Sequence, residues 1–378
     1  MRITHPDSLG FLFSRSCEPL TISDLSSEGA CELEILVSVG DTEYTFKSTA
    51  VGGTLTLRLS DILRHFETPL FSHDIASGFI HVKMPGIGVI AMYTEDEWSS
   101  WAGSCIFGGC HRPADEITAL ASGKYWWTFR PQSALTYKFS KEYLAMARPA
   151  DECADVRLDL TLHFARAGKV SAVWYERIAP DATIAGRPSI VVIDCSYMVI
   201  RAKADELGYA DDTLLAYDIA GTDADNPSTF DMPVGQRFIV ARNDSRVRGW
   251  MFRNSLGMLD TVYSWGDVTR DVNSEMTTFK TLRTTRELDN FSEEIWSVDT
   301  GYVDKKEMLQ LWYEFFRSKE RYAILSDGTV AEIVVDEIGA EHQVGQTGNL
   351  SFKCRLSKET EGYDFTKGVL EDFSDEFT

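Results

Sequence analysis

Strict alternation of apolar and polar residues constrains the fold of this chain more than any other feature. In DVRLDLTLHF (155–164), apolar residues take every second position, and CELEILVSV (31–39) repeats the pattern. Successive side chains of a β-strand point to opposite faces, so the pattern predicts strands with one buried face and one face in water. Such a wet face is typical of antiparallel sheets.

More strands are predicted along the whole chain. Clusters of Gly, Pro, Asp and Asn separate them at a spacing typical of β-sandwiches. They are EYTFKS (43–48), GTLTLRLS (53–60), KVSAVWYERI (169–178), SIVVIDCSYMVI (189–200), TVAEIVVDEI (329–338) and NLSFKCRLS (349–357).

Signals for helices are few. Asp304 and Glu307 form a capping box, and the apolar residues Met308, Leu311, Trp312, Phe315 and Phe316 then fall on one helical face. A short helical turn is predicted from Ser60. Because long helices do not alternate with the strands, the pattern argues against a doubly wound α/β sheet. The fold is therefore predicted to be mostly β and multi-domain, built from antiparallel β-sandwich-like modules with one principal short helix near 304–317.

A chain of 378 residues is too long for one ordinary domain. Two polar segments indicate boundaries, ARPADECAD (147–155) and GTDADNPSTFDMPVG (221–235). They predict an N-terminal β-rich domain (1–150), a middle β-sandwich-like domain (151–235), a C-terminal β-rich domain with one helix (236–357) and an acidic tail (358–378). The tail is expected either to be disordered or to dock on a neighbour.

Charge and cysteine usage narrow the classes of function. The net charge of −21 argues against direct nucleic-acid binding, which needs a clustered basic surface. The charge also disfavours a membrane-surface role, and no window approaches the roughly 18 apolar residues of a membrane span. The first twenty residues lack a signal-peptide pattern. Seven scattered cysteines do not form a disulfide framework, so we expect reduced thiols and folding in a cytoplasm.

Two segments suggest a bound metal or haem but fit poorly. CIFGGCH (105–111) has four residues between its cysteines, whereas haem attachment uses two, and a zinc site would need two further ligands. Asp223, Asp225 and Asn226 begin a calcium-like run, but Ser228 and Val234 stand where an EF-hand loop needs Gly and Glu. We therefore expect no cofactor and no metal.

Catalytic motifs are also lacking. Adjacent carboxylates such as Glu293–Glu294 and Asp211–Asp212 are common in so acidic a chain, and a glycosidase needs two carboxylates facing each other across a cleft. The sequence contains no Gly-x-Ser-x-Gly elbow, His-Glu-x-x-His helix or Walker loop. No catalytic residue is predicted.

Aromatic residues concentrate in two places. YWWTFRPQ (125–132) contributes Tyr125, Trp126, Trp127 and Phe129, which are candidates for a sugar-stacking platform or for core and interface packing. Packing is favoured, because no converging polar groups are visible and aromatic side chains dominate cores and interfaces.

WMFRNSLGMLDTVYSWG (250–266) is the second concentration. Its alternation predicts burial of Trp250, Phe252, Leu256, Leu259 and Val262 around a tight turn from Asn254 to Gly257 at a strand end. The proposed turn and packing motif comprises Trp250, Phe252, Asn254, Gly257 and Asp260.

Three blocks carry a resemblance to a protein group. WWTFRPQSALTYKFSKEYLAM (126–146) resembles a segment of uncharacterised virion or tail-type proteins of phages and prophages of Bacteroidota. FRNSLGMLDTVYSWG (252–266) is similar to a second block with an Asn-Ser-Leu-Gly-x-x-Asp turn. LQLWYEFFRSKERYAILSDGTVAEIVVDEI (309–338) is similar to a third, a short helix followed by two strands. In the N-terminal third, only EYTFKSTAVGGTLTLRLSDIL (43–63) shows a hairpin-like similarity.

The resemblance implies a β-rich structural component of a tail, tail tip or baseplate, located in the virion, and brings no catalytic residues. Such a protein would assemble with itself and with other tail proteins. A carbohydrate-binding adhesin that recognises a host surface glycan is the first alternative, and a glycan-cleaving enzyme is the second. The adhesin requires exposed aromatics at 125–130, and the enzyme requires opposed carboxylates.

Overall fold

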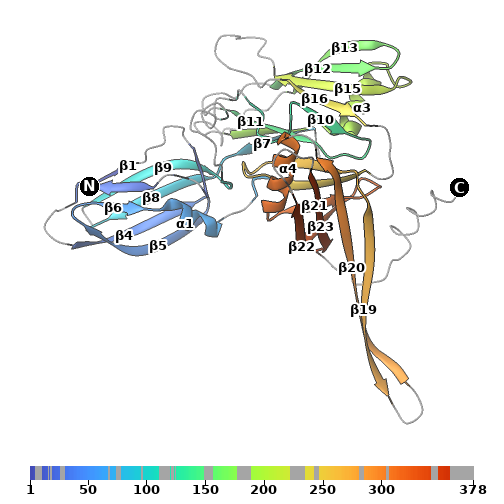
Figure 1. Ribbon diagram of the computed structural model, residues 1–378. Helices are drawn as coiled ribbons and strands as arrows, with labels where there is room; N and C mark the ends of the chain where they lie inside the picture. The colour runs from blue at the N-terminus through green and yellow to red at the C-terminus, as the bar shows by residue number, and fades with distance from the viewer. Residues whose placement is uncertain are drawn as a thin grey trace.

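The structure is a computed structural model. It describes residues 1–4, 11–15, 17, 19–25, 30–66, 69–73, 78–94, 97–109, 120, 123, 125–148, 156–176, 189–221, 235–241, 247–280, 285–303, 306–341 and 348–357. Strands predominate over helices, which confirms a mostly β, multi-domain, β-sandwich-like protein (Figure 1).

Two sheets near the N-terminus pack face to face as a sandwich. One contains β1 (Arg2–Thr4), β3 (Leu20–Ser23) and β6 (Leu55–Leu57). The other has the order β2 (Phe11–Phe13), β9 (Trp98–Ile106), β8 (Gly86–Met92), β4 (Ala30–Val39), β5 (Thr42–Val51). Their apolar faces share one core, while Glu32 and Glu34 of β4 are exposed as the alternation predicts. α1 (Leu59–Leu63) and the 3₁₀ turn η1 (Arg64–Phe66) follow β6, where a short turn is predicted.

A central sheet of three strands lies between two hydrophobic cores. Its order is β11 (Tyr143–Arg148), β14 (Ser189–Asp194), β7 (Phe79–Lys83). Along β11, Tyr143 and Ala145 belong to one core, and Leu144 and Met146 belong to the other. Every residue of β14 is buried. A strand covered on both faces has no polar alternation, which accounts for the continuous apolar run SIVVI in the sequence.

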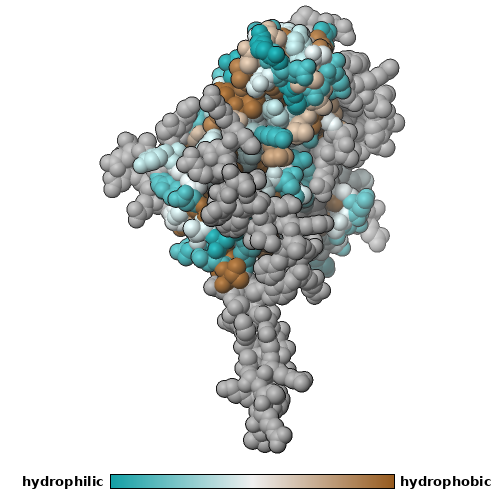
Figure 2. All heavy atoms as spheres, turned by 90° about the vertical axis from the view of Figure 1, so that its right-hand side faces the viewer, coloured by the Kyte–Doolittle hydropathy of each residue, from teal (hydrophilic) through white to brown (hydrophobic). Residues whose placement is uncertain are grey.

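A five-stranded sheet covers one face of the central sheet. Its order is β10 (Ser133–Thr136), β16 (Gln236–Val240), β15 (Leu214–Gly221), β12 (Val156–Phe164), β13 (Gly168–Glu176). The predicted alternation of β12 is confirmed, since Leu158, Leu160, Leu162 and Phe164 are buried in the core that this sheet shares with β11 and β14. The part of the molecule that carries this sheet, at the top of Figure 2, shows mainly hydrophilic residues with some apolar ones between them.

A seven-stranded sheet, with α4 (Lys306–Arg317) packed on it, covers the other face. Its order is β18 (Leu259–Ser264), β17 (Arg248–Arg253), β21 (Arg321–Ile324), β22 (Val330–Glu341), β23 (Gly348–Leu356), β20 (Thr285–Val303), β19 (Val268–Lys280). α4 confirms the principal helix near 304–317, and Leu311, Trp312 and Phe315 bury its apolar face. Asp304 of the capping box lies outside the described residues.

β19 and β20 extend far beyond the rest of this sheet (Figure 1). They pair with each other from Val268–Val298 out to Lys280–Thr285, whereas β20 pairs with β23 only through Trp296–Val303. The part beyond Val272 and Glu294, which we call the arm, therefore has no third strand among the described residues.

Two sequence predictions need correction. SIVVIDCSYMVI was interpreted as one strand, but β14 ends at Asp194 and α3 (Tyr197–Glu206) begins after Ser196. Ser196 Oγ and its backbone N–H both bond Asp194 Oδ1, and this local bonding ends the strand. The sheets are also not wholly antiparallel, because β2 pairs with β9 and β10 pairs with β16 in parallel.

The predicted domain boundaries stay predictions, and hydrogen-bonded sheets extend across two of them. β7, β10 and β11, all within 1–150, pair in the central and five-stranded sheets with strands from later parts of the chain. β16, from the predicted C-terminal domain, lies between β10 and β15. The acidic tail lies outside the described residues, as do the segments 149–155 and 222–234 of the predicted linkers.

Candidate functional site

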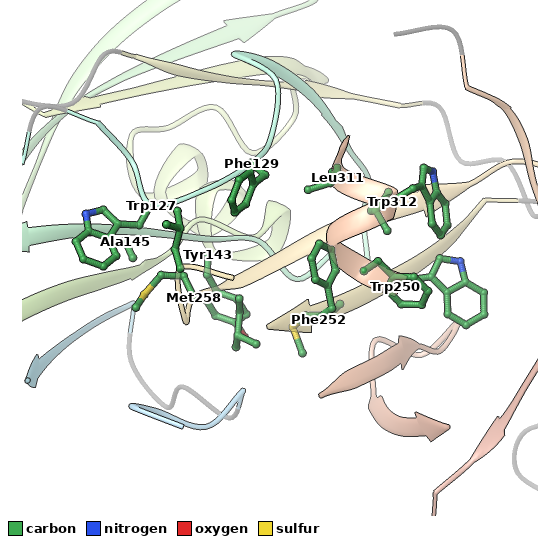
Figure 3. Close-up of a cluster of buried hydrophobic side chains, with 14 of the residues drawn as sticks. Trp127, Phe129, Tyr143, Ala145, Trp250, Phe252, Met258, Leu311 and Trp312 are labelled. Atoms are coloured by element: carbon green, nitrogen blue, oxygen red, sulfur yellow. The ribbon is translucent and has the colours of Figure 1, made fainter. Parts of the chain in front are cut away.

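The three blocks that carry the family resemblance meet in one hydrophobic core. Trp127 and Tyr143 come from the first block, Phe252 and Met258 from the second, and Trp312 from the third (Figure 3). Phe11 and Phe13 of β2 contact the Trp127 ring, with centroid distances of 5.7 and 6.0 Å. Segments far apart in sequence are thus joined to one another and to the N-terminal sandwich by this core.

The second block is buried, as its alternation predicts. Trp250, Phe252, Leu256, Leu259 and Val262 are at most 1% exposed. The indole Nε1 of Trp250 donates to Ser264 Oγ at 2.9 Å, and its ring lies 5.0 Å from that of Phe352 in an edge-on arrangement. These bulky groups fill the core under α4.

Asn254 holds the tight turn together. Gly257 N donates to Asn254 O at 2.9 Å, and Asn254 Oδ1 accepts the backbone N–H of Leu256 and Met258, both at 3.0 Å. Asn254 Nδ2 donates to Asp260 Oδ2 at 2.7 Å and to Trp127 O at 3.3 Å. The side chain therefore fixes the turn and ties the second block to the first.

Asp260 lies at the centre of a buried polar network. Its carboxylate accepts hydrogen bonds from the Thr128 hydroxyl and from Phe129 N. Arg130 Nη1 lies 3.2 Å from Asp260 Oδ1, and Arg130 Nη2 lies 2.9 Å from Glu142 Oε2. The three charged side chains are at most 1% exposed. The network contains one cation and two carboxyl groups.

The Arg130–Glu142 contact is short but poorly aligned. Arg130 Nη2 and Glu142 Oε2 make no hydrogen bond, so the contact is an ion pair by distance alone. The Arg130 guanidinium is held elsewhere by Nη1, which donates to Tyr143 O at 2.7 Å. Glu142 Oε1 accepts a hydrogen bond from the Tyr263 hydroxyl.

Burial raises the pKa of Glu142 to about 7, against the opposing influence of Arg130 and of the Tyr263 hydrogen bond, while Asp260 raises it further. One guanidinium balances one carboxylate, so a second buried carboxylate keeps its proton more readily. Burial works against the charge of Arg130, but the charges of Glu142 and Asp260 outweigh burial and raise the Arg130 pKa. These charged groups are almost fully buried, and their contacts join the first block to the second inside the protein.

Two glycine-containing segments approach each other closely beside the turn. Gly109 N donates to Ser255 O at 2.8 Å, so the segment that follows β9 is hydrogen-bonded to the turn. A Cβ on Gly108 would lie 2.4 Å from Ser255 O, and one on Gly257 would lie 2.8 Å from Phe107 O. Gly257 also has φ +83, a conformation that other residues rarely adopt. The sandwich thus contacts the second block through backbone that leaves no room for side chains.

We expect Gly257→Ala to lower the free energy of unfolding by about 2–4 kcal/mol, from left-handed backbone strain of about 1–2 kcal/mol plus the clash with Phe107 O. Gly168→Ala is the matched control, because Gly168 has φ +73 and open space around its Cβ position. Gly108→Ala isolates the clash, because no positive φ occurs there. Urea denaturation measures all three, and equal losses for Gly257→Ala and Gly168→Ala would show that the close approach is unimportant.

A cleft of about 680 Å³ opens beside this contact. Arg15, Arg64 and Gly109 line it from the N-terminal sandwich, and Ser255, Arg317 and Lys319 line it from the other side. Arg253 also lines it, so its described lining contains five cationic side chains and two carboxylates, Glu314 and Glu320. We therefore call it the basic cleft.

Both carboxylates of the basic cleft are engaged within the protein. Glu314 Oε2 accepts the Ser255 N–H at 2.9 Å. Glu320 bonds Arg253 through both oxygens, at 2.6 and 2.9 Å. Burial opposes ionisation of Glu320, but Arg253 outweighs it and lowers the pKa of the carboxyl. The charge left facing the cleft is therefore positive.

The predicted aromatic platform is mostly inside the protein. Trp126, Trp127 and Phe129 are 6%, 1% and 8% exposed, and only Tyr125 of the four candidates is substantially exposed, at 43%. Trp127 donates its indole N–H to Leu120 O, and Trp126 packs in the core under the five-stranded sheet. These positions fit the interpretation of Trp126, Trp127 and Phe129 as packing residues. An adhesin requires exposed aromatic rings here, and these three rings are buried.

The other candidate residues from the sequence, the adjacent carboxylates and the cysteines, have structural roles where the structure describes them. Asp212 accepts the backbone N–H groups of Arg166, Ala167 and Thr213, and Glu294 accepts the Trp296 indole N–H. Cys105, Cys195 and Cys354 are buried and form no disulfide. Cys110, His111 and the run 223–226 lie outside the described residues.

No group of three or more His, Cys, Asp or Glu side chains in the described ranges is placed to hold a metal ion. None of the described helices is long and apolar enough to span a membrane.

Sequence reasoning identified Asp260 but missed Arg130, Glu142 and Tyr263. The available signal was a charge inside an apolar run, since Arg130 follows YWWTF and Glu142 precedes YLAMA. Charged residues are almost never fully buried unless they are paired, so two of them bordering apolar segments indicate an internal ion pair. No protein-family model matches this chain, and no curated protein matches its sequence.

Proposed function

We propose that this chain is a non-enzymatic structural protein of a phage-type virion tail, which assembles with copies of itself and with other tail proteins. The observation that carries the assembly part is the arm formed by β19 and β20. The virion part rests on the resemblance of the three blocks. Because the three blocks meet in one shared core, they form one structural unit rather than three unrelated aromatic patterns.

The arm would contact another molecule in the assembly. An isolated two-stranded hairpin is marginally stable in water, yet this one runs outward from Val272–Glu294 to Lys280–Thr285. At about 3.3 Å per residue, that stretch extends roughly 25–30 Å. Along the arm, neither outer edge pairs with another strand among the described residues, so a strand of another chain can be added there. Docking against a neighbouring copy would supply the missing stabilisation.

The test replaces residues 273–293 with Asn-Gly. Val272 and Glu294 are already cross-strand partners, and Asn-Gly favours a two-residue hairpin turn, so the body should fold unchanged. We expect the full chain to form larger species as its concentration rises, and the arm-replaced variant to form markedly smaller species at each concentration. Sedimentation velocity measures both, and negative-stain electron microscopy shows whether rings or tubes form.

The control is Val173→Lys, which puts a charge on another exposed strand, at the edge of the five-stranded sheet. It should assemble like the parent chain. A full chain that stays monomeric at every concentration, or an arm-replaced variant that assembles equally well, would contradict the proposal. Saturable binding to a glycan array by a monomeric chain would favour the adhesin instead.

A further inference from the structure

We propose that the basic cleft binds the acidic segment 358–378 of a second copy of this chain. This inference rests on the proposed function, because it identifies a contact through which copies are joined. The basic cleft contains an excess of positive charge in a chain whose net charge is −21. Copies with that charge repel one another, so an assembly needs contacts where opposite charges meet.

Two cations of the basic cleft have no bonding partner among the described residues. Arg64, in η1, and Arg317, in the last turn of α4, are exposed and make no hydrogen bond or ion pair with any described residue. They line the cleft from two different elements, η1 and α4. A guanidinium binds carboxylates with two parallel N–H groups, so an acidic peptide in the cleft would be held by both elements.

The segment 358–378 matches the lining in composition. It has seven carboxylate side chains and two lysines, and its part EDFSDEF (371–377) places Phe373 and Phe377 among four acids. The lining of the cleft combines its cations with the apolar groups Pro69, Phe107 and Phe129. A volume of about 680 Å³ is within the range of ligand sites and accommodates several side chains. The acidic and aromatic side chains of 358–378 therefore match the cationic and apolar groups that line the cleft.

The first experiment titrates the full chain into a fluorescein-labelled peptide of residues 358–378 and follows anisotropy. We expect saturable binding that weakens as salt is added. In the Arg64→Glu/Arg317→Glu variant, binding should weaken at least tenfold. Arg58→Glu is the matched control, because Arg58 is exposed near η1 but does not line the basic cleft, and it should bind like the parent.

Specificity is tested by charge exchange. A peptide carrying Asp372→Lys and Asp375→Lys should bind the parent chain poorly and the Arg64→Glu/Arg317→Glu variant better. Near-ultraviolet circular dichroism confirms that the variant is folded. Absence of saturable peptide binding, or equal binding by parent and variant, would overturn the proposal. Binding of inorganic phosphate at the same arginines, without peptide binding, would assign the cleft to a free anion.

The second experiment identifies whose segment occupies the cleft. Full chains labelled with ¹⁴N and ¹⁵N are mixed, and lysines are cross-linked, with Lys367 of the segment and Lys319 of the cleft as the expected pair. Pairs that combine both isotopes are expected, and pairs of a single isotope only would show that each chain covers its own cleft. Mixed-isotope pairs in an arm-replaced variant that assembles as well as the parent would contradict the proposed role of the arm alone, and assembly without peptide binding would contradict this inference alone.

Discussion

Asp260→Ala is expected to lower the free energy of unfolding by about 3–5 kcal/mol, the usual cost of removing one partner from a buried charged network. The change leaves the Thr128 hydroxyl, Phe129 N and Asn254 Nδ2 without their common acceptor. It also leaves Arg130 with Glu142 as its one remaining carboxylate partner. An unsatisfied buried donor costs about 1–3 kcal/mol, so these losses accumulate.

Urea denaturation followed by tryptophan fluorescence measures this loss, since Trp127, Trp250 and Trp312 all lie in the affected core. The control is Asp205→Ala, which removes an Arg201 ion pair whose aspartate is 46% exposed. Exposed pairs contribute about 0–1 kcal/mol, so the control should unfold almost like the parent. A loss below about 1 kcal/mol for Asp260→Ala would show that the network does not hold the first and second blocks together.

Glu142→Gln is expected to stabilise the protein at pH 8 by about 3 kcal/mol more than at pH 4, since each pKa unit corresponds to about 1.4 kcal/mol. The pKa of Glu142 is raised in the folded state from 4.5 to about 7. The folded state therefore binds more protons than the unfolded state between these values, and stability falls as the pH rises through that window. Gln carries no proton that can be lost, so its variant avoids this fall.

The measurement compares urea unfolding of the parent and of Glu142→Gln at pH 4, 5, 6, 7 and 8. Other ionisable groups contribute equally to both proteins, so the difference between the two curves reports Glu142. Glu206→Gln, at an exposed carboxylate paired with Lys203, corrects for the loss of one negative charge. A difference that is flat from pH 4 to pH 8 would show that Glu142 does not titrate within this window in the folded protein.

Local sequence patterns predicted the parts of the fold that depend on local contacts. The alternation in β12 predicts a strand with one buried face and one face in water. The helical spacing of Leu311 and Phe315 in α4 likewise predicts which face of the helix is buried. The strand–helix boundary at Ser196 was missed, because an apolar run continues across it. Periodicity alone does not separate a strand covered on both faces from the start of a helix.

The candidate site depends mostly on contacts between distant segments. Asn254 and Gly257 could be predicted as turn residues, because their types provide local hydrogen bonding and positive φ. The Arg130–Asp260 ion pair joins residues 130 positions apart, and the basic cleft forms between β9, η1 and α4. Neither a residue's type nor its neighbours in sequence indicate which distant residue it will contact. Those contacts depend on how the sheets pack against one another.

The central sheet determines the order in which this chain can fold during synthesis. The strands of the N-terminal sandwich are complete once Ile106 has left the ribosome, but β7 must wait for β14 and β10 must wait for β16. Until then both faces of β11 lack their covering layers, with Tyr143 and Leu144 among the exposed side chains. Pairings over such separations are slow and leave apolar surface open. Fragments ending before β16 are therefore expected to aggregate rather than accumulate as folded domains.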